Sequence, residues 1–402
     1  MNITKVAEGI TKLTANIENI LFEGFWEIPN GVSLNSYIVR GEKTAMIDGV
    51  FDFKDVSDAH IRALERADID VKKIDYIIIN HMEPDHTSWI ENMDKFNKDT
   101  KIVCGAKSAK LLDAFFGYTD NVQIVKDGDT LDLGKGRVLT FKEIPNLHWP
   151  DTIATFDRLS GTLFSCDAFG SYGKVGKDGY DDTLSEEKIV HYEQEAVKYY
   201  SNVIATFSMA VSAALKKLET LEIKIIAPGH GIVWRNNPDR IINDYIRYAS
   251  YQKTPNKKEV AILIGSMYGM TRKGAEKAIE AFEGEDVKLH VHDVVEDSWS
   301  AILASVWQSQ GIILAMPTYE YKMYPPMASV LEEVCKKKAM NRKAFRLGSF
   351  GWSGGAQKEL DEIMEKNRSS WTFLKPVEFM GAPRKQDLQD IKSRVKQLIA
   401  SL

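Results

Sequence analysis

The chain has 402 residues, of which 44% are hydrophobic and 27% are charged, and its formal net charge is −5. At roughly 150 residues per domain, this length predicts two or three domains. The mildly acidic charge gives no reason to expect nucleic acid or a membrane as the main partner, and no apolar run approaches the roughly 18 residues that span a bilayer. The beginning, MNITKVAEGITKL, lacks the basic and then apolar pattern of a signal peptide, so we expect a cytoplasmic location.

Short β-rich runs dominate the first 250 residues. They are YIVRGEKTAMIDG, IDYIIIN, KIVCG, VQIVKDGDTLDLG, RVLTFKEI and GTLFSCD. Gly, Asp and Asn separate many of these runs, which favours antiparallel pairs. Two helices are expected among them, one over residues 54–67 and a long one from about Ser185 to Thr220. Residues 1–250 are therefore interpreted as one domain.

The polar residues 251–258, which include a proline, are typical of a linker. After them, five strands alternate with five helices over residues 259–402. The expected strands are EVAILIG, DVKLHVHDV, GIILAMP, AFRLGSF and TFLKPVEFMG. This regular alternation predicts a doubly wound α/β domain with a parallel sheet. Its size fits a flavodoxin-like five-stranded sheet of order 2-1-3-4-5.

Residues with metal-binding side chains follow several of the predicted strands. The motif HMEPDH comes directly after IDYIIIN, and single candidates follow three later strands. Loops at one edge of a sheet can converge, and two metals with four protein ligands each need eight donor atoms. Seven side chains supply them if one carboxylate bridges, and Asp167, alone on its strand, is the natural bridge. The candidate ligands are His81, Glu83, Asp85, His86, His148, Asp167 and His230. An alternative is a capped helix start at Asp85 and Thr87, but this leaves the later residues unexplained.

Three loops of the second predicted domain are placed for a flavin, because doubly wound domains bind ligands at the carboxyl ends of their strands. In the first loop, SMYGMT, the hydroxyls of Ser266 and Thr271 and a helix N-terminus suit a phosphate. The absence of GxGxxG and GxxxxGK[ST] leaves a monophosphate such as FMN. Aromatic residues of the other two loops could flank the flavin ring, although Tyr319 or Trp352 could simply pack. The candidates are Ser266, Met267, Tyr268, Gly269, Met270, Thr271, Pro317, Thr318, Tyr319, Glu320, Tyr321, Ser349, Phe350, Gly351, Trp352, Ser353 and Gly354.

The metal motif is similar to that of the metallo-β-lactamase fold, whose zinc hydrolases carry H-x-H-x-D-H. Here Glu83 stands in place of the second histidine. A carboxylate is a hard anionic donor, and mixed histidine and carboxylate sets suit non-haem iron. H-x-E-x-D-H, the LHWPD segment and a following flavodoxin-like domain together resemble the flavodiiron proteins, such as rubredoxin:oxygen oxidoreductases, over essentially the whole chain.

This resemblance implies an αββα sandwich for the first domain, FMN in the three loops, and two irons. One iron would be bound by His81, Glu83 and His148, the other by Asp85, His86 and His230, with Asp167 bridging. Tyr199 looks like a tyrosine that lies beside the ligands in that family, although it could be an ordinary core residue. One local departure is Met270, where a small or polar residue is expected near the phosphate.

The implied activity is reduction of O2 to water, of NO to N2O, or of both. The three cysteines form no CxxC, which argues against a disulfide framework, a cysteine-rich zinc site or a fused rubredoxin-type iron centre. Electrons would then come from a separate donor, such as rubredoxin, another reductase or reduced coenzyme F420. The family also implies a head-to-tail homodimer or a dimer of dimers. Two alternatives stay open: a zinc hydrolase with a flavodoxin appendage, and an electron carrier with a vestigial metal site.

Overall fold

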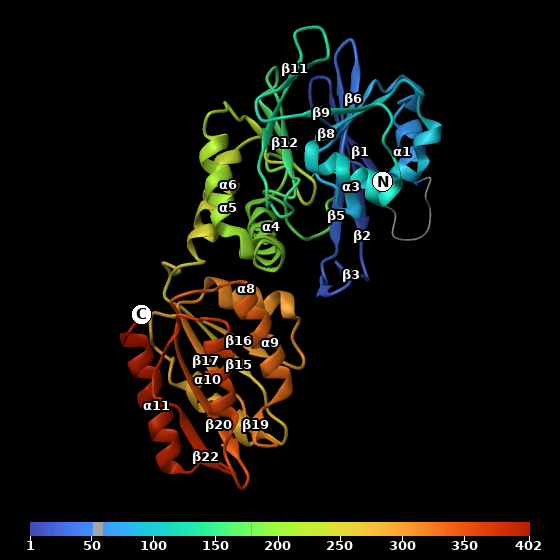
Figure 1. Ribbon diagram of the computed structural model, residues 1–402. Helices are drawn as coiled ribbons and strands as arrows, with labels where there is room; N and C mark the ends of the chain where they lie inside the picture. Colours follow the sequence, from blue (N-terminus) through green and yellow to red (C-terminus); the bar gives the residue numbers. More distant parts are fainter. Residues whose placement is uncertain (51–58, 178) are drawn as a thin grey trace. The chain divides into compact units, whose positions relative to one another are not determined.

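The computed structural model describes residues 1–50, 59–177 and 179–402, with the side chains of residues 59 and 60 left out. The chain forms two compact units (Figure 1). The first comprises residues 1–200 and 207–246, and the second residues 201–206 and 247–402. Among the helices in these described ranges, none has the length and apolar character to span a membrane. The expected linker at residues 251–258 stays a prediction, and part of the expected helix 54–67 lies outside the described residues.

Two sheets form the centre of the first unit. The described strands of the larger sheet have the order β1-β2-β5-β6-β7-β8-β9. They span Asn2–Ala7, Ile10–Ile17, Val32–Arg40, Thr44–Ile47, Tyr76–Ile79, Lys101–Gly105 and Val122–Val125. The smaller sheet runs in chain order from β10 to β14. Its strands span Thr130–Asp132, Val138–Glu143, Ile153–Asp157, Thr162–Cys166 and Ile225–Pro228. A short separate hairpin joins β3 (Leu21–Phe22) and β4 (Trp26–Glu27).

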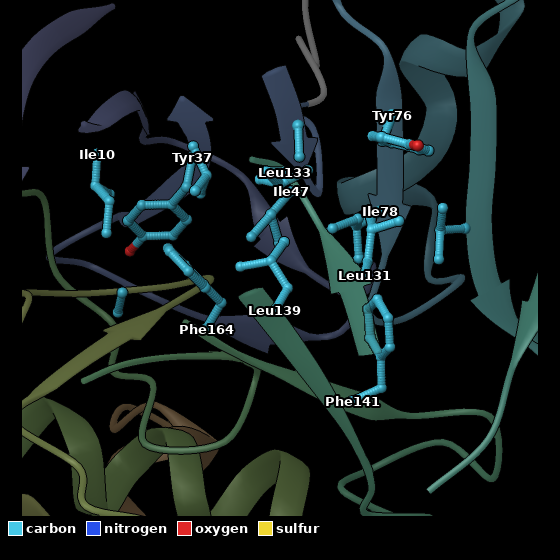
Figure 2. Packing of buried hydrophobic residues seen from close by; sticks show 14 of the residues in the cluster. Ile10, Tyr37, Ile47, Tyr76, Ile78, Leu131, Leu133, Leu139, Phe141 and Phe164 are labelled. Carbon is cyan, nitrogen blue, oxygen red and sulfur yellow. The ribbon is translucent and has the colours of Figure 1, made fainter. Parts of the chain in front are cut away.

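The main core of this unit lies between the two sheets. Ile47 and Ile78 of the larger sheet and Leu139, Phe141 and Phe164 of the smaller one belong to a single buried cluster (Figure 2). Helices cover the outer faces, with α1 and α3 against the larger sheet and α4, α5 and α6 beside the smaller one (Figure 1). This arrangement confirms the predicted αββα sandwich. The helices span Ala59–Arg66 (α1), Ala106–Phe116 (α3), Glu186–Tyr199 (α4), Ser208–Leu218 (α5) and Pro238–Ser250 (α6).

The prediction that the β-rich runs pair antiparallel is wrong for four of the ten described strand pairs in these two sheets. Strands β6, β7, β8 and β9 are parallel to one another, and β13 is parallel to β14. Parallel neighbours need a crossover connection, whereas antiparallel neighbours need only a turn. The turn residues between the runs mark where strands end, and they do not decide which strands pair. The parallel strands matter for the site, because their carboxyl ends all lie at the same edge.

The single long helix expected from about Ser185 to Thr220 is also wrong. Helix α4 begins as predicted, since the Ser185 hydroxyl accepts a hydrogen bond from the Lys188 N–H. A π-helical turn at Tyr200–Ile204 and a 3₁₀ turn at Ala205–Phe207 then separate it from α5. Residues 201–206 belong to the second compact unit, and long-range packing of this kind overrides local helix propensity.

The second unit has the predicted parallel sheet. The described strands have the order β16-β15-β17-β20-β21, with β22 also paired to β20, which confirms the flavodoxin-like order. The last predicted strand is divided at Pro376 into β21 and β22, because proline has no N–H for the ladder. The strands span Glu259–Ile264 (β15), Lys288–Asp293 (β16), Gly311–Ala315 (β17), Lys343–Phe350 (β20), Thr372–Phe373 (β21) and Val377–Met380 (β22). The helices span Met270–Glu280 (α7), Trp299–Gln308 (α8), Pro325–Lys336 (α9), Ala356–Lys366 (α10) and Lys385–Ala400 (α11).

Candidate metal centre and cofactor pocket

All seven predicted metal ligands lie together at one edge of the sandwich. His81 and Glu83 follow β7, and the short helix α2 (Pro84–Thr87) carries the next two candidates. The remaining three follow β11, β13 and β14. Their donor atoms form two groups, and Asp167 of the first also lies close to His86 of the second. The groups are His81, Glu83, His148 and Asp167, and Asp85, His86 and His230.

The first group, which we term position one, is formed by His81, Glu83, His148 and one oxygen of Asp167. Glu83 Oε2 lies 3.1 Å from His81 Nε2 and 2.9 Å from His148 Nε2. Asp167 Oδ2 lies 3.2 Å and 3.3 Å from the same two nitrogens. Donors that share one metal at about 2.0–2.2 Å are separated by about 3 Å. The four atoms therefore fit a single ion.

The second group, position two, uses the other oxygen of Asp167. Oδ1 lies 2.9 Å from His86 Nε2 and 3.1 Å from His230 Nε2. Asp85 completes the group, with Oδ2 3.4 Å from His230 Nε2 and Oδ1 3.6 Å from His86 Nε2. Asp167 thus turns one oxygen to each position, as a bridging carboxylate would. Gly229 is required here, because a Cβ at that residue would meet the His86 ring at 2.8 Å.

Several of these buried donors have no hydrogen-bond partner among the described residues. They include both oxygens of Asp85, Oδ2 of Asp167 and Nε2 of His230. Buried polar atoms normally find partners, so a group of unpaired donors directed at one place fits a metal. The alternative of a capped helix start at Asp85 and Thr87 is wrong, since Thr87 makes no side-chain cap and neither oxygen of Asp85 has a hydrogen-bond partner among the described residues.

Two of the three carboxylates at the centre, Glu83 and Asp167, stay ionised. Burial raises the pKa of Glu83, but hydrogen bonds to His148 and His81 outweigh it and bring the pKa to about 2. Burial likewise raises the pKa of Asp167, whereas the charges of His81 and His86 hold it well below its usual range. Both groups are therefore anionic acceptors at neutral pH, which suits a hard cation.

The histidines show the complementary effect. Burial lowers the pKa of His86, but Asp85 and Asp167 outweigh it and raise the pKa to about 10. Burial also lowers the pKa of His148, whereas the neighbouring carboxylates of Asp167 and Glu83 raise it to about 9. A metal binds such imidazoles by replacing their protons, so the carboxylates that stabilise the protonated rings would stabilise a bound cation as well.

Tyr199, the other predicted site residue, is fully buried beside the second position. Its ring lies 5.5 Å from His230 and 5.2 Å from Tyr172. Its hydroxyl has no hydrogen-bond partner in the described part of the chain. Burial raises the pKa of Tyr199 well above its usual value, and the charge of Asp167 adds to this. The hydroxyl therefore keeps its proton and can donate it in a hydrogen bond.

Sequence reasoning missed the residues that support the ligands. Asp151 lies 3.5 Å from His81 Nδ1, and the Ser33 carbonyl oxygen lies 3.0 Å from His230 Nδ1. Asp48 accepts hydrogen bonds from the backbone and side chain of Asn80 at 2.8 Å and 3.1 Å. Only Asp151 carried a signal, because it belongs to the same LHWPD segment as a predicted ligand. The others become visible only when the strands are paired.

The second unit has a cavity of about 450 Å³ at the carboxyl ends of its strands. All three predicted loops contribute to the wall, with thirteen of the seventeen candidates. Gly269, Tyr321, Ser353 and Gly354 do not line it, and Gly381, which the sequence reasoning missed, does. The thirteen are Ser266, Met267, Tyr268, Met270, Thr271, Pro317, Thr318, Tyr319, Glu320, Ser349, Phe350, Gly351 and Trp352. Pockets of about this size hold small ligands and cofactors.

The loops of this pocket are held together by two close contacts. Thr271 Oγ1 accepts a hydrogen bond of 3.2 Å from the Ser349 N–H, which joins the first loop to the third. Gly355 has φ +151°, and a Cβ there would meet the Tyr321 carbonyl oxygen at 1.9 Å, so the third loop can approach the second only with glycine. Gly269, at φ +82°, precedes α7, and the Ser266 hydroxyl accepts a hydrogen bond of 3.3 Å from the Arg272 N–H in the first turn of that helix.

Comparisons with known proteins show which family the chain resembles. Residues 32–231 match the model of the ODP family beta lactamase. An anaerobic nitric oxide reductase flavorubredoxin of Salmonella paratyphi B is 34% identical over 343 residues, which cover 83% of this chain and 69% of that protein. The chain belongs to the flavodiiron proteins. It spans 66% to 69% of the length of the flavorubredoxins that it matches.

Solved flavodiiron structures extend this likeness to the whole chain. The rubredoxin oxygen:oxidoreductase of Desulfovibrio gigas has a TM-score of 0.91 and 27% identity, and the match covers 100% of this chain and 98% of that one. A flavo di-iron protein mutant from Thermotoga maritima has a TM-score of 0.88 and 28% identity, with 99% and 98% covered. Both units of this flavodiiron protein therefore have counterparts of the same fold.

Thr271→Ala is expected to weaken FMN binding by about 10-fold or more while the metal centre stays intact. The change removes a hydroxyl from the expected phosphate site and also breaks the contact with Ser349, and each hydrogen bond contributes about 1 kcal/mol. The dissociation constant can be measured by titrating the flavin-free protein with FMN and following fluorescence. Ser353→Ala, a change in a neighbouring loop residue that does not line the cavity, is the control and should leave FMN affinity unchanged.

Proposed function

We propose that this flavodiiron protein reduces O2, NO or both, with two irons at positions one and two and FMN in the pocket of the second unit. The observation that carries the proposal is Glu83, whose carboxylate takes the place between His81 and His148 where zinc hydrolases of this fold carry a histidine. Ionised Glu83 adds a hard anionic donor, which suits iron that changes its oxidation state. The relatives named nitric oxide reductase and rubredoxin oxygen:oxidoreductase support it.

When bound, reduced FMN and two ferrous ions together supply up to four electrons, enough to reduce O2 to two waters or, with two electrons, to join two NO molecules into N2O and water. The chain's own residues bind the metals, exclude water and provide a proton donor. His86, His230 and Asp167 form the inner side of position two. Beside them lies the Tyr199 hydroxyl, which has no hydrogen-bond partner among the described residues and can donate a proton. Phe22 packs on His230 at 5.7 Å and keeps this side apolar.

The runner-up is a zinc hydrolase with a flavodoxin appendage. It is weaker because a hydrolytic zinc site of this fold has a neutral imidazole where Glu83 stands. It also gives no role to a cavity lined by three loops at strand ends. An electron carrier with a vestigial metal site is weaker still, since the donor atoms of all seven candidate ligands lie together.

We propose a head-to-tail homodimer, or a dimer of dimers, in which the FMN of one chain faces the metal centre of its partner. Exposed apolar side chains around the pocket support this, since large exposed apolar patches mark contact surfaces. Tyr268 is 87% exposed and Trp352 is 78% exposed. A monomer that performs a full single turnover would contradict this assembly.

The electron donor is proposed to be a separate rubredoxin-like protein, another reductase or reduced F420. The three cysteines are free thiols, two of them buried, so the described residues offer no cysteine cluster for an iron centre of the rubredoxin type. Free thiols also suit the reducing cytoplasm, where we propose that the protein acts.

The proposal is tested by the metal content of protein that is made without added metals and purified anaerobically. We expect about two irons per chain, as the two positions imply, and consumption of O2 or NO once the bound flavin is reduced. Two zincs per chain, with mis-loading during expression excluded, would favour the hydrolase. Ester, thioester and phosphodiester substrates would then be assayed.

Tyr199→Phe is expected to lower turnover with O2 or NO by about 100-fold, the lower end of the effect of a positioned proton donor. The phenyl ring keeps the packing on His230, so iron and FMN contents should stay unchanged. Tyr172→Phe is the matched control, since Tyr172 is equally buried and packs on the ring of Tyr199 itself. Equal turnover in the two variants would leave Tyr199 as an ordinary core residue.

A further inference from the structure

We infer that Asp151 is a positioning residue that fixes His81 for metal binding and makes position one the more tightly binding of the two. This inference rests on the proposed function, because it concerns the irons at positions one and two. It begins with the ring nitrogen of His81 that faces away from the centre. When His81 Nε2 binds a metal, the remaining ring proton is on Nδ1, and Nδ1 needs an acceptor.

Asp151 is placed to be that acceptor. Its Oδ1 lies 3.5 Å from His81 Nδ1. Neither atom has another hydrogen-bond partner among the described residues, and Asp151 is 3% exposed. Because each of these buried polar atoms lacks another partner, we expect Nδ1–H to donate a hydrogen bond to Oδ1 when a metal holds the ring. The result is a carboxylate–histidine–metal arrangement, in which the carboxylate fixes the ring orientation and raises the basicity of the ligand.

The other oxygen of Asp151 is anchored independently. Oδ2 accepts hydrogen bonds of 2.9 Å from the Met82 N–H and 3.1 Å from the Ser108 hydroxyl. Asp151 therefore ties the loop that carries His148 to the loop that carries His81 and to helix α3. Since its carboxylate is fixed by these two donors, it can hold the His81 ring rather than follow it.

Among the described residues, no carboxylate oxygen faces the outer ring nitrogen, Nδ1, of either histidine of position two. His230 Nδ1 faces the neutral backbone carbonyl of Ser33 at 3.0 Å, and His86 Nδ1 has no hydrogen-bond partner in the described part of the chain. The charge of Asp48 raises the pKa of His86 from a distance, but both oxygens of Asp48 accept hydrogen bonds from Asn80. Each position has one carboxylate of its own and shares Asp167, so Asp151 gives position one an additional negative charge beside a ligand.

The inference is tested with Asp151→Asn. Asparagine keeps the size and can still accept from Met82 and Ser108, but it presents no anion to His81. Apo protein is titrated anaerobically with Fe²⁺, and the affinity of each of the two binding steps is measured. We expect the affinity of the tighter step, which the inference assigns to position one, to fall by about 10–100-fold, as on loss of an outer partner of a metal ligand. The affinity of the weaker step should stay the same.

Asp157→Asn is the matched control. Asp157 is equally buried and lies at the end of β12, the strand that follows Asp151, where it pairs with Arg137 at 2.7 Å. The four residue steps from Ile153 to Asp157 alone place it about 13 Å from the start of that strand. This variant reports general destabilisation, and it should bind both irons with wild-type affinity.

Single-position variants identify which position Asp151 serves. Asp85→Ala leaves position one, and Glu83→Ala leaves position two. Addition of Asp151→Asn should weaken binding only in the Asp85→Ala protein, with Co²⁺ absorption as a second probe of each position. Equal weakening in both, or two unchanged Fe²⁺ steps in Asp151→Asn itself, would overturn the inference and leave the proposed function standing. A wild-type chain that binds no pair of irons would instead overturn the proposed function.

Discussion

Asp167→Ala is expected to remove both irons at once. Asp167 Oδ2 lies within 3.3 Å of two histidine nitrogens of position one, and Oδ1 within 3.1 Å of two at position two. Loss of this side chain takes one ligand from each metal and removes a charge that balances four histidines. The effect on metal affinity should exceed the roughly 10–100-fold that follows loss of an outer partner, and turnover should fall below detection.

The measurement is iron per chain after anaerobic purification, together with FMN per chain. FMN should stay at the wild-type level, since its pocket is formed within the second unit. Asp157→Asn removes another fully buried carboxylate of the first unit, and this control should retain two irons. An Asp167→Ala protein that binds two irons with near-normal affinity would disprove the bridging role.

Glu83→His should change which metal the protein prefers. It replaces a carboxylate whose pKa is held at about 2 by hydrogen bonds to His148 and His81 that outweigh burial with a neutral imidazole. Position one would then resemble a zinc site of the hydrolases, with less anionic donation to a redox metal. We expect the ratio of bound iron to zinc, from protein loaded with both metals at equal concentration, to fall by about 10-fold or more.

Turnover with O2 and NO should fall in parallel in Glu83→His, whereas FMN binding should stay intact. Glu83→Gln separates the two effects of the change, because it removes the charge and keeps the size. If the charge decides metal preference, Glu83→Gln should also lose iron. Unchanged reduction of O2 and NO by Glu83→His would count strongly against the proposed role of Glu83.

Some features of this protein can be predicted from short stretches of sequence. The ligands of HMEPDH lie within six residues, so their chemistry can be read from the motif itself. The order of the second sheet is similarly local, since regular alternation of strands and helices with right-handed crossovers leaves few topologies. The thirteen pocket residues follow from the same rule, because strand ends define the loops that meet.

Other features depend on contacts far apart in the chain. The alternation of turns and strands in the first unit favours antiparallel pairs, but helical crossover connections join β7 to β8 and β8 to β9, and these strands pair in parallel. The helix expected over residues 185–220 is interrupted where residues 201–206 join the second unit. Gly381 reaches the pocket only because β22 pairs with β20.

By itself, the sequence determined the donor set, the family resemblance and the topology of the second unit, because these depend on residue type and on short spacings. Only the tertiary structure decided that the two oxygens of Asp167 face different positions, that Tyr199 keeps an unpaired hydroxyl beside one of them, and that Asp151 faces His81 across a separation of 70 residues. Those relations depend on how strands pair and on which buried polar atoms find partners, and neither is set by residues that are neighbours in the sequence.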